Sequence, residues 1–282
     1  MKHLADKVAA ITGAGSGLGR SLALVLADEG CHLALADINL QGLQETARLL
    51  EGKPIKTSSQ QLDVADREQV YAWADATVRE HGAVDLIINN AGVAVFEKLE
   101  KLSYEDFEWV FNVNFWGVVY GTRAFLPYLK QRPEGHIVNI SSINGMVPFP
   151  DNGPYNVAKF ALRGFNLTLV QEMRGTPVHV TSVHPGGIQT NIVRNARFRK
   201  PADREINQND LVEVFASIAK TTPDQAARKI VKGIKKNRER LLVGLDAKFI
   251  DAMSRLAPLT TLKITAIIHE FLLARKAGQK KG

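Results

Sequence analysis

The chain has 282 residues, of which 45% are hydrophobic and 23% charged, and its formal net charge is +7. These proportions are typical of a globular protein and exclude a disordered or low-complexity chain. The one cysteine, Cys31, excludes an internal disulfide and leaves too few thiolates for a structural zinc site. No signal-peptide core and no run of ~20 apolar residues is present, so we expect a cytoplasmic protein.

The basic charge is concentrated near the C-terminus, where the segment Arg228–Arg240 holds seven basic residues and one acidic residue. Such a patch suits nucleic acid or an anionic membrane surface. No zinc-finger, homeodomain or RNA-binding signature accompanies it. We therefore interpret it as a solvated helix face and expect no nucleic-acid partner.

Apolar, β-branched runs alternate with amphipathic helical patterns along the chain. Strands are expected at Val8–Thr12, His32–Asp37, Ile55–Asp63, Asp85–Asn89, His136–Ser141, Val178–His184 and Leu241–Gly244. Helices are expected at Leu18–Glu29, Leu40–Glu51, Asp66–His81, Tyr104–Lys130, Tyr155–Arg174 and Pro223–Lys236. Continuous apolar strands are typical of a parallel sheet buried on both faces. The alternation predicts an α/β fold with one doubly wound parallel sheet of about seven strands, in a single domain over residues 1–282.

Thr190–Leu211 is polar and has no clear period. It follows a strand end, where open α/β sheets bind ligands, so we expect a substrate lid over about residues 190–215. A surface connection without a role is the alternative.

Leu256–Lys276 carries a broad apolar helical stripe that charged residues interrupt. We expect a C-terminal helical extension over about residues 246–276 that packs on its own domain or on a partner subunit. Peripheral contact with a membrane through this basic region is a less favoured alternative.

A glycine-rich turn directly follows the first expected strand. Gly13, Gly17 and Gly19 are spaced G-x-x-x-G-x-G, and a helix begins within the turn. Glycine permits the sharp turn and lets backbone N–H groups approach a phosphate at the positive end of the helix. The position after the first buried strand therefore predicts a dinucleotide site.

Asp37 ends the second expected strand, eighteen residues after Gly19. An acidic residue at about this distance usually accepts hydrogen bonds from the adenosine ribose. It would repel the 2′-phosphate of NADP by about 4 kcal/mol per charge pair at ~4 Å and an effective dielectric constant of ~20. No nearby lysine or arginine in the turn or after the strand offsets this repulsion, so we expect NAD rather than NADP. The alternative is that Asp37 only caps the next helix.

Tyr155 and Lys159 are four residues apart on an expected helix, so both project from one face. A tyrosine pKa of about 10 is too high for a base near neutrality. The Lys159 ammonium and a bound NAD⁺ favour the phenolate, and lowering its pKa to ~7 requires about 4 kcal/mol. Alone, this pair is weak evidence.

Two further polar residues support a catalytic site. Ser142 follows the strand His136–Ser141, where its hydroxyl can donate a hydrogen bond to a carbonyl or alkoxide oxygen. Asn114 lies within an apolar expected helix, where such a residue often binds a water or a distorted backbone carbonyl.

These motifs resemble those of the short-chain dehydrogenase/reductase family. In chain order, the matching segments are T-G-x-x-x-G-x-G at Thr12–Gly19, N-N-A-G at Asn89–Gly92, the helix asparagine Asn114, the serine Ser142, Y-x-x-x-K at Tyr155–Lys159, and P-G at Pro185–Gly186 followed by Thr190. The order and spacing agree over residues 1 to about 192. Two departures are Ala158, where many members have serine, and the bulky pair Phe115–Trp116.

The resemblance implies a Rossmann-type domain that binds NAD(P). In such enzymes the residue that matches Tyr155 is the acid/base, and the residue that matches Lys159 binds the nicotinamide ribose and lowers the tyrosine pKa. The family's serine, here Ser142, holds the substrate oxygen. Its asparagine, here Asn114, supports a water in a proton relay. These four are the expected catalytic residues.

The family's cofactor contacts carry over to positions in the turn and at the strand ends. The resemblance implies that Asp63 contacts adenine and that Ile188 and Thr190 bind the carboxamide. The expected cofactor-binding residues are Gly13, Ser16, Gly17, Leu18, Gly19, Asp37, Asp63, Val64, Asn90, Ala91, Gly92, Tyr155, Lys159, Pro185, Gly186, Ile188 and Thr190.

The expected reaction is reversible hydride transfer between nicotinamide and the carbinol carbon of a secondary alcohol or ketone. The positions expected on the substrate side are apolar, which favours a medium to large apolar substrate. They are Val93, Val95, Phe96, Val147, Pro148, Phe149, Ile192, Val193 and Phe198. An NADP-preferring carbonyl reductase, an epimerase or dehydratase, and a catalytically idle dinucleotide-sensing protein are the alternatives.

The lid also carries basic residues that either pair with an anionic substrate group or, as we favour, are solvated: Arg194, Arg197, Arg199, Lys200 and Arg204. Family members usually assemble through helices that match Tyr104–Lys130 and Tyr155–Arg174, so a homodimer or homotetramer is expected. None of the seven histidines has metal-ligand spacing, and we expect no metal.

Overall fold

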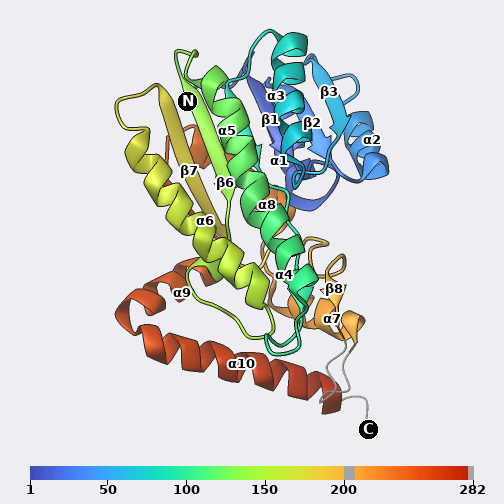
Figure 1. Cartoon of the computed structure of the whole chain (residues 1–282), viewed down its shortest axis with the longest axis vertical. Coiled ribbons are helices and arrows are strands. Elements are labelled where there is room, and N and C mark those ends of the chain that lie inside the picture. Colours follow the sequence, from blue (N-terminus) through green and yellow to red (C-terminus); the bar gives the residue numbers. More distant parts are fainter. Residues whose placement is uncertain (200–206, 279–282) are drawn as a thin grey trace.

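The structure is a computed structural model, and it describes residues 1–199 and 207–278. Its centre is a sheet of seven parallel strands in the order β3-β2-β1-β4-β6-β7-β9 (Figure 1). These strands are β1 (Val8–Thr12), β2 (His32–Asp37), β3 (Thr57–Gln61), β4 (Leu86–Asn89), β6 (Gly135–Ile140), β7 (Val178–Pro185) and β9 (Arg240–Val243). The strand order reverses between β1 and β4, and open sheets bind nucleotides at the carboxyl ends of two such strands.

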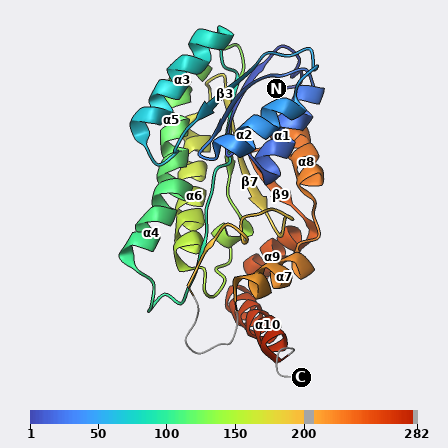
Figure 2. The ribbon, with the colours of Figure 1, turned by 90° about the vertical axis from the view of Figure 1, so that its right-hand side faces the viewer.

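Helices cover both faces of the sheet (Figures 1 and 2). On one face lie α1 (Gly17–Asp28) and α8 (Pro223–Ile234), and on the other lie α3 (Arg67–His81), α5 (Gly117–Leu129) and α6 (Gly153–Glu172). The short helix α2 (Leu40–Leu49) packs beside β2 and β3. The prediction of a doubly wound α/β sheet with helices on both faces is confirmed.

The central strands are largely apolar because they supply side chains to two cores, whereas the edge strand β3 is polar and partly exposed. In β2, Leu33 and Leu35 pack in the core that contains α1 and α8, whereas Ala34 and Ala36 pack in the core that contains α3, α5 and α6. Successive side chains of a strand point to opposite faces, so a strand covered on both faces needs an apolar residue at every position.

The long helix expected at Tyr104–Lys130 is not regular. It comprises α4 (Tyr104–Phe111), a π-helical segment η1 (Asn112–Trp116) and α5. Asn114 is fully buried, and its amide donates to Val93 O and accepts from Val93 N, both at 2.8 Å. This pairing fixes the asparagine against the loop after β4. Single π turns within α-helices occur frequently at functional sites.

The expected lid contains structure that the sequence pattern did not predict. Arg197–Phe198 forms β8, which pairs with β5 (Val95–Phe96) in a separate two-stranded sheet. Helix α7 (Gln208–Ile218) begins at Asn207, whose side chain forms a capping box with Asp210. Residues 200–206, which include Lys200 and Arg204, lie outside the described residues.

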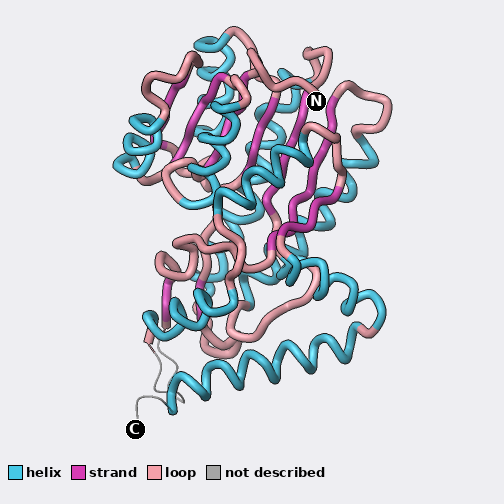
Figure 3. The backbone as a smooth tube through the Cα atoms, turned by 180° about the vertical axis from the view of Figure 1, so that it is seen from behind, coloured by secondary structure: helices cyan, strands magenta, loops and turns pink. Residues whose placement is uncertain are grey.

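The C-terminal extension consists of two helices, α9 (Leu245–Leu256) and α10 (Pro258–Gly278), because Pro258 begins a new helix. Ala247 of α9 packs beside the short 3₁₀ helix η2 (Ile143–Gly145). Leu273 of α10 packs on Leu211 of α7, and α10 crosses one end of the molecule (Figures 1 and 3). Among the described residues, none of the helices has the length and apolarity needed to span a bilayer.

The replacement Phe125→Ala tests the core between α3 and α5. The Phe125 ring is fully buried and meets Trp73 edge-on, with 5.0 Å between ring centroids. Loss of this ring should lower the free energy of unfolding by about 3–5 kcal/mol, measured by urea denaturation. Phe249→Ala, which removes an exposed ring of α9, is the matched control and should change it by less than about 0.5 kcal/mol.

Candidate active site

A hydrogen-bonded junction joins the glycine turn to the loop after β4. Thr12 Oγ1 accepts from the backbone N–H of Asn90 at 3.0 Å and of Ala91 at 3.1 Å. In return, Asn90 Nδ2 donates to Thr12 O at 3.0 Å and Gly13 O at 3.2 Å. The carboxyl ends of β1 and β4 are therefore held together at the switch point of the sheet.

The glycines of the turn lie so close to neighbouring backbone that a larger residue would not fit. A Cβ at Gly19 would lie 2.0 Å from Gly13 O, and Gly13 itself has a φ of +66°. Ser16 precedes α1 and its side chain makes no capping hydrogen bond, whereas Leu18 packs in the core. The turn therefore leaves room for a phosphate close to the first backbone N–H groups of α1.

Asp37 lies against this turn, as expected. Its Oδ2 accepts from Gly15 N at 2.8 Å and its Oδ1 from Asn39 N at 2.8 Å. The carboxylate is therefore held at the carboxyl end of β2, beside the place where the turn would hold a phosphate.

Arg20 holds the other side of Gly15 and was not singled out from the sequence. Its guanidinium donates to Gly15 O at 2.6 Å and pairs with Glu45 at 2.8 Å. Gly15 is therefore fixed through both its N–H and its C=O. An arginine one turn into an amphipathic helix carries no sequence signal for such a role.

Two other positions expected to contact the adenosine half follow β3. Asp63 Oδ1 accepts from Ala65 N at 2.9 Å, which orients the carboxylate within its own loop. Val64 packs on α5, where a Cβ at Gly117 would lie 2.9 Å from Val64 Cγ2. Gly92, in the loop after β4, lies close to Asn114: a Cβ at Gly92 would be 3.2 Å from Asn114 Oδ1.

The segment after β7 reaches back to the glycine turn. Thr190 lies beside Gly17, with its Cβ 3.4 Å from the position of a Cβ at Gly17. Ile188 is buried in the core, so only its backbone groups are placed to meet a carboxamide. The structure thus brings the turn and the expected carboxamide segment together.

Asp246 supports this segment from α9 and was not predicted. It accepts from Gly187 N at 2.7 Å, and a Cβ at Gly186 would lie 2.0 Å from its Oδ2. The glycine after Pro185 is therefore required by the close approach of this carboxylate.

Ser142, Tyr155 and Lys159 meet at the carboxyl end of β6. The Lys159 ammonium is buried, donates to Ile140 O at 3.0 Å, and lies 5.4 Å from the centroid of the Tyr155 ring. Ser142 lies near the Tyr155 hydroxyl: burial raises the pKa of that phenol, and the Ser142 side chain opposes the rise. The three expected catalytic side chains at this end of β6 and α6 are therefore neighbours.

The ionisation of this group in the chain alone differs from the expectation. Burial raises the pKa of Tyr155, an effect that the nearby Ser142 side chain opposes, and desolvation lowers the pKa of Lys159 to about 8. Lys159 therefore does not by itself acidify the phenol. The stabilisation of the phenolate must come mainly from Ser142 and from the positive charge of an oxidised cofactor.

Asn114, the fourth expected catalytic residue, is placed differently. It lies on η1, which packs against α6, but both polar groups of its amide bind Val93. Its side chain is thus committed to positioning the loop after β4. A relay water would have to be held by backbone groups of the π turn.

Asn144 and Asn156 connect the serine to the helix of the tyrosine, and neither was predicted. Ser142 Oγ donates to Asn144 Oδ1 at 3.2 Å and accepts from Asn144 N at 3.1 Å. Asn144 Nδ2 donates to Asn156 Oδ1 at 2.8 Å, and Asn156 Nδ2 to Phe149 O at 2.7 Å. The side chain next to Tyr155 therefore fixes the loop that carries Ser142.

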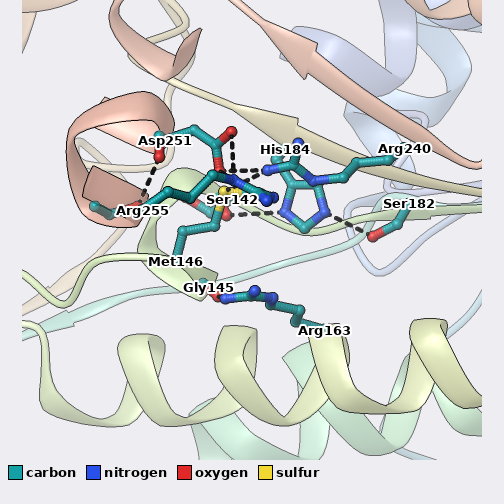
Figure 4. A network of polar contacts seen from close by, with 10 residues as sticks. Ser142, Gly145, Met146, Arg163, Ser182, His184, Arg240, Asp251 and Arg255 are labelled. Carbon is teal, nitrogen blue, oxygen red and sulfur yellow. Dashed lines mark hydrogen bonds and ion pairs between the residues drawn. The ribbon is translucent and has the colours of Figure 1, made fainter. Parts of the chain in front are cut away.

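A second network, from β7, contacts the backbone of Ser142 (Figure 4). His184 Nδ1 lies 3.3 Å from Ser142 O, and its Nε2 lies 2.9 Å from Ser182 Oγ. Desolvation lowers the pKa of His184 to about 4, so the ring is neutral and donates from one nitrogen only. Nearby, Arg240 binds both Asp251 of α9 and Met146 Sδ, which ties α9 to the loop after Ser142.

Two of the lid arginines, Arg197 and Arg199, have structural partners. Arg197 and Arg199 both bind the buried carboxylate of Asp106 at 2.9 Å, and the Arg197 guanidinium lies 3.9 Å from the centroid of the Trp109 ring. These two side chains are therefore ion-paired with the protein and not simply solvated. The apolar lid residues Ile192, Val193 and Phe198 pack with Phe96 in one cluster.

Comparison with known proteins agrees with this arrangement. A family model described as short chain dehydrogenase matches residues 7–201, well over half of the chain. The chain belongs to the short-chain dehydrogenase family. The resemblance drawn from its motifs is thereby confirmed.

Relatives of this short-chain dehydrogenase extend over nearly its whole length. It is 46% identical over 259 residues to the "Putative oxidoreductase SadH" of Mycobacterium tuberculosis, covering 91% of this chain and 92% of the relative. A short-chain dehydrogenase/reductase from Burkholderia phymatum in complex with NAD superimposes with a TM-score of 0.82 at 31% identity, covering 91% and 96% of the two chains. An alcohol dehydrogenase from Thermococcus sibiricus complexed with 5-hydroxy-NADP has a TM-score of 0.70 at 28% identity, covering 84% and 95%. The chain therefore has the nucleotide-binding fold of this oxidoreductase family.

The replacement Lys159→Met tests the burial of the ammonium. The pKa of Lys159 is about 8 in the folded chain against 10.5 for a free lysine. The unfolded chain thus binds more protons between these values, so stability rises with pH there. The unfolding free energy of the wild type, relative to that of the variant, should therefore increase by about 2 kcal/mol from pH 7 to pH 10. Denaturation without cofactor at the two pH values measures this difference.

Lys232→Met, which removes an exposed lysine of α8, is the control and should show no such pH-dependent difference. A constant difference between Lys159→Met and the wild type at both pH values would contradict the assignment of a desolvated ammonium.

Proposed function

We propose that this short-chain dehydrogenase is an NAD-dependent oxidoreductase that acts on a secondary alcohol or ketone. The observation that carries the proposal is the contact of Ser142 and Lys159 with Tyr155, close to a glycine turn that suits a dinucleotide phosphate. A proton-transfer group, a hydrogen-bond donor and a buried cation at one strand end are what a carbinol oxidation requires.

A bound nicotinamide dinucleotide supplies the hydride acceptor or donor. The chain's own residues manage the proton and the oxygen of the substrate. In the oxidation direction, the Tyr155 oxygen takes the hydroxyl proton, and Ser142 holds the substrate oxygen by a hydrogen bond. Lys159 holds its ammonium beside the ring, where it adds to the positive charge of an oxidised cofactor, and the two charges together would favour the phenolate over the phenol.

The position of Asp37 supports NAD as the cofactor. Its carboxylate accepts from the backbone of Gly15, inside the turn, and so lies where a ribose 2′-substituent would extend. A 2′-phosphate there would meet a negative charge. Arg20, which binds Gly15 O in the same turn, already pairs with Glu45.

Apolar residues on the substrate side support a medium to large apolar substrate. Val147 and Phe149 follow the catalytic serine, and the lid contributes Ile192 and Phe198. A site with this lining favours the transfer of apolar groups from water and offers few charged partners.

We further propose that the enzyme is a homodimer or homotetramer. Helices α4 to α6 expose large apolar side chains, and the exposed fraction is 89% for Tyr104 and 56% for Leu167. Trp116, Val157 and Phe160 extend this surface along the same helices. A second copy would remove these side chains from water.

The replacement Tyr155→Phe should abolish turnover while the cofactor still binds. Removal of the proton acceptor should cost about 10²–10⁴-fold in kcat, measured by the absorbance of NADH with a panel of secondary alcohols. Binding of NADH, followed by quenching of tryptophan fluorescence, should be unchanged. Tyr128→Phe removes a hydroxyl that binds Asp75 on the surface and is the matched control. A Tyr155→Phe enzyme with wild-type kcat would refute the mechanism.

The replacement Asp37→Ser should shift the cofactor preference toward NADP. Since the carboxylate is half-exposed, we expect the ratio of kcat/KM for NADP to that for NAD to rise by about 30-fold, from a loss of about 2 kcal/mol of repulsion. Glu51→Ser, which removes an exposed carboxylate beyond α2, is the control. A wild-type enzyme that already prefers NADP would overturn this part of the proposal and leave the oxidoreductase assignment intact.

A further inference from the structure

Helix α10 exposes more apolar side chains than it buries, although Leu273 is buried against α7. Thr261 and Thr265 are buried, and their hydroxyls donate to nearby backbone carbonyls, Ala257 O at 2.9 Å and Leu262 O at 3.0 Å. The exposed face instead carries isoleucines and a phenylalanine at the spacing i, i+3, i+4, i+7: Ile264, Ile267, Ile268 and Phe271. A helix that simply packed on its own domain would have the opposite distribution.

Helix α9 repeats this inversion. Its buried positions are Ala247 and Asp251, whereas Leu245, Phe249 and Leu256 are exposed, with exposed fractions of 82%, 68% and 83%. These three lie at i, i+4 and i+11, which again places them along one side of the helix. Two consecutive helices therefore present apolar stripes to solvent.

We call the exposed apolar side chains of these helices the C-terminal apolar surface, made of Leu245, Phe249, Leu256, Leu259, Ile264, Ile267, Ile268 and Phe271. It lies at one end of the molecule, formed by α9 and α10 (Figures 1 and 3). A group of large exposed apolar side chains on neighbouring elements marks an interaction surface.

The charges around this surface indicate its partner. Of the exposed charged residues described on α9 and α10, Lys248, Arg255, Lys263 and Arg275 are basic, and only Glu270 is acidic. Lys263 and Arg275 stand within the exposed side of α10 itself. A second copy of the chain would bring these like charges together, whereas an anionic lipid surface would be attracted to them. Long basic side chains can also lie along an apolar surface and extend their charges to lipid headgroups.

We propose that the C-terminal apolar surface binds peripherally to an anionic lipid bilayer, with α9 and α10 lying in the interface. The helices are too polar on their inner faces to enter the hydrocarbon core, but their outer faces suit the boundary between headgroups and acyl chains. Helix α10 also packs on α7 of the lid, so the bound lipid would lie beside the segments that flank the substrate side. This proposal does not depend on the proposed reaction.

The test is co-sedimentation of the full chain with vesicles. The wild type should bind vesicles that contain phosphatidylglycerol, bind phosphatidylcholine vesicles at least about tenfold more weakly, and be released by salt. The double variant Ile267→Glu/Phe271→Glu should lose at least about tenfold in binding, and Lys263→Glu/Arg275→Glu should lose the preference for anionic lipid.

Leu49→Glu places the same carboxylate at an exposed leucine of α2 and is the matched control, which should bind like the wild type. Circular dichroism and NADH binding should be unchanged in every variant, which separates lost lipid binding from unfolding. A wild type that does not bind anionic vesicles would overturn the proposal, as would undiminished binding of the double variant. If the double variant instead changes only the oligomeric state, measured by light scattering, the surface joins two copies of the chain and the lipid proposal fails.

Discussion

A buried ammonium group is the constraint on which the candidate site depends. Lys159 places its positive charge in a desolvated position beside the Tyr155 ring, and its hydrogen bond goes to a neutral carbonyl, Ile140 O. In the described part of the chain no carboxylate forms an ion pair with it. A buried charge without a counter-ion costs free energy, and only a rigid surrounding structure keeps it in place.

That rigidity comes from polar groups between the strands and helices. Asn89 Nδ2 donates to Asn139 Oδ1 at 2.8 Å, Asn139 Nδ2 to Asn166 Oδ1 at 2.7 Å, and Asn166 Nδ2 to Ser182 Oγ at 2.8 Å. This chain crosses β4, β6, α6 and β7 and ends at His184, which contacts the backbone of Ser142. The strands that carry the site are therefore fixed to each other by directional bonds in addition to apolar packing.

Most of the sheet could be predicted because its central strands are largely apolar at consecutive positions, a pattern that depends on each segment alone. The same is true of the motif residues Thr12, Ser142, Tyr155 and Lys159, whose places follow from the ends of those strands and the start of a helix. Features that depend on distant contacts could not be predicted. The π turn at Asn114 depends on Val93, and the β5–β8 pair depends on Asp106 and its two arginines.

The supporting residues of the site were missed for the same reason. Arg20, Asn144 and Asp246 act on backbone groups that the chain brings near only after folding. The division of the C-terminal extension into two helices had a local signal, Pro258, and the capping pair Asn207 and Asp210 was a local signal for α7. Such helix-start signals are visible in a sequence, but a helix becomes stable only when it also packs against the rest of the protein.

The carboxylate of Asp246 limits how far the C-terminal region can be shortened. It occupies the second position of α9 and supports Gly186 and Gly187, in the segment after β7. A truncation just after β9 would therefore remove a support of the nucleotide end of the sheet together with α9 and α10. A shortened chain must supply another acceptor for Gly187 N or rebuild the loop after β7.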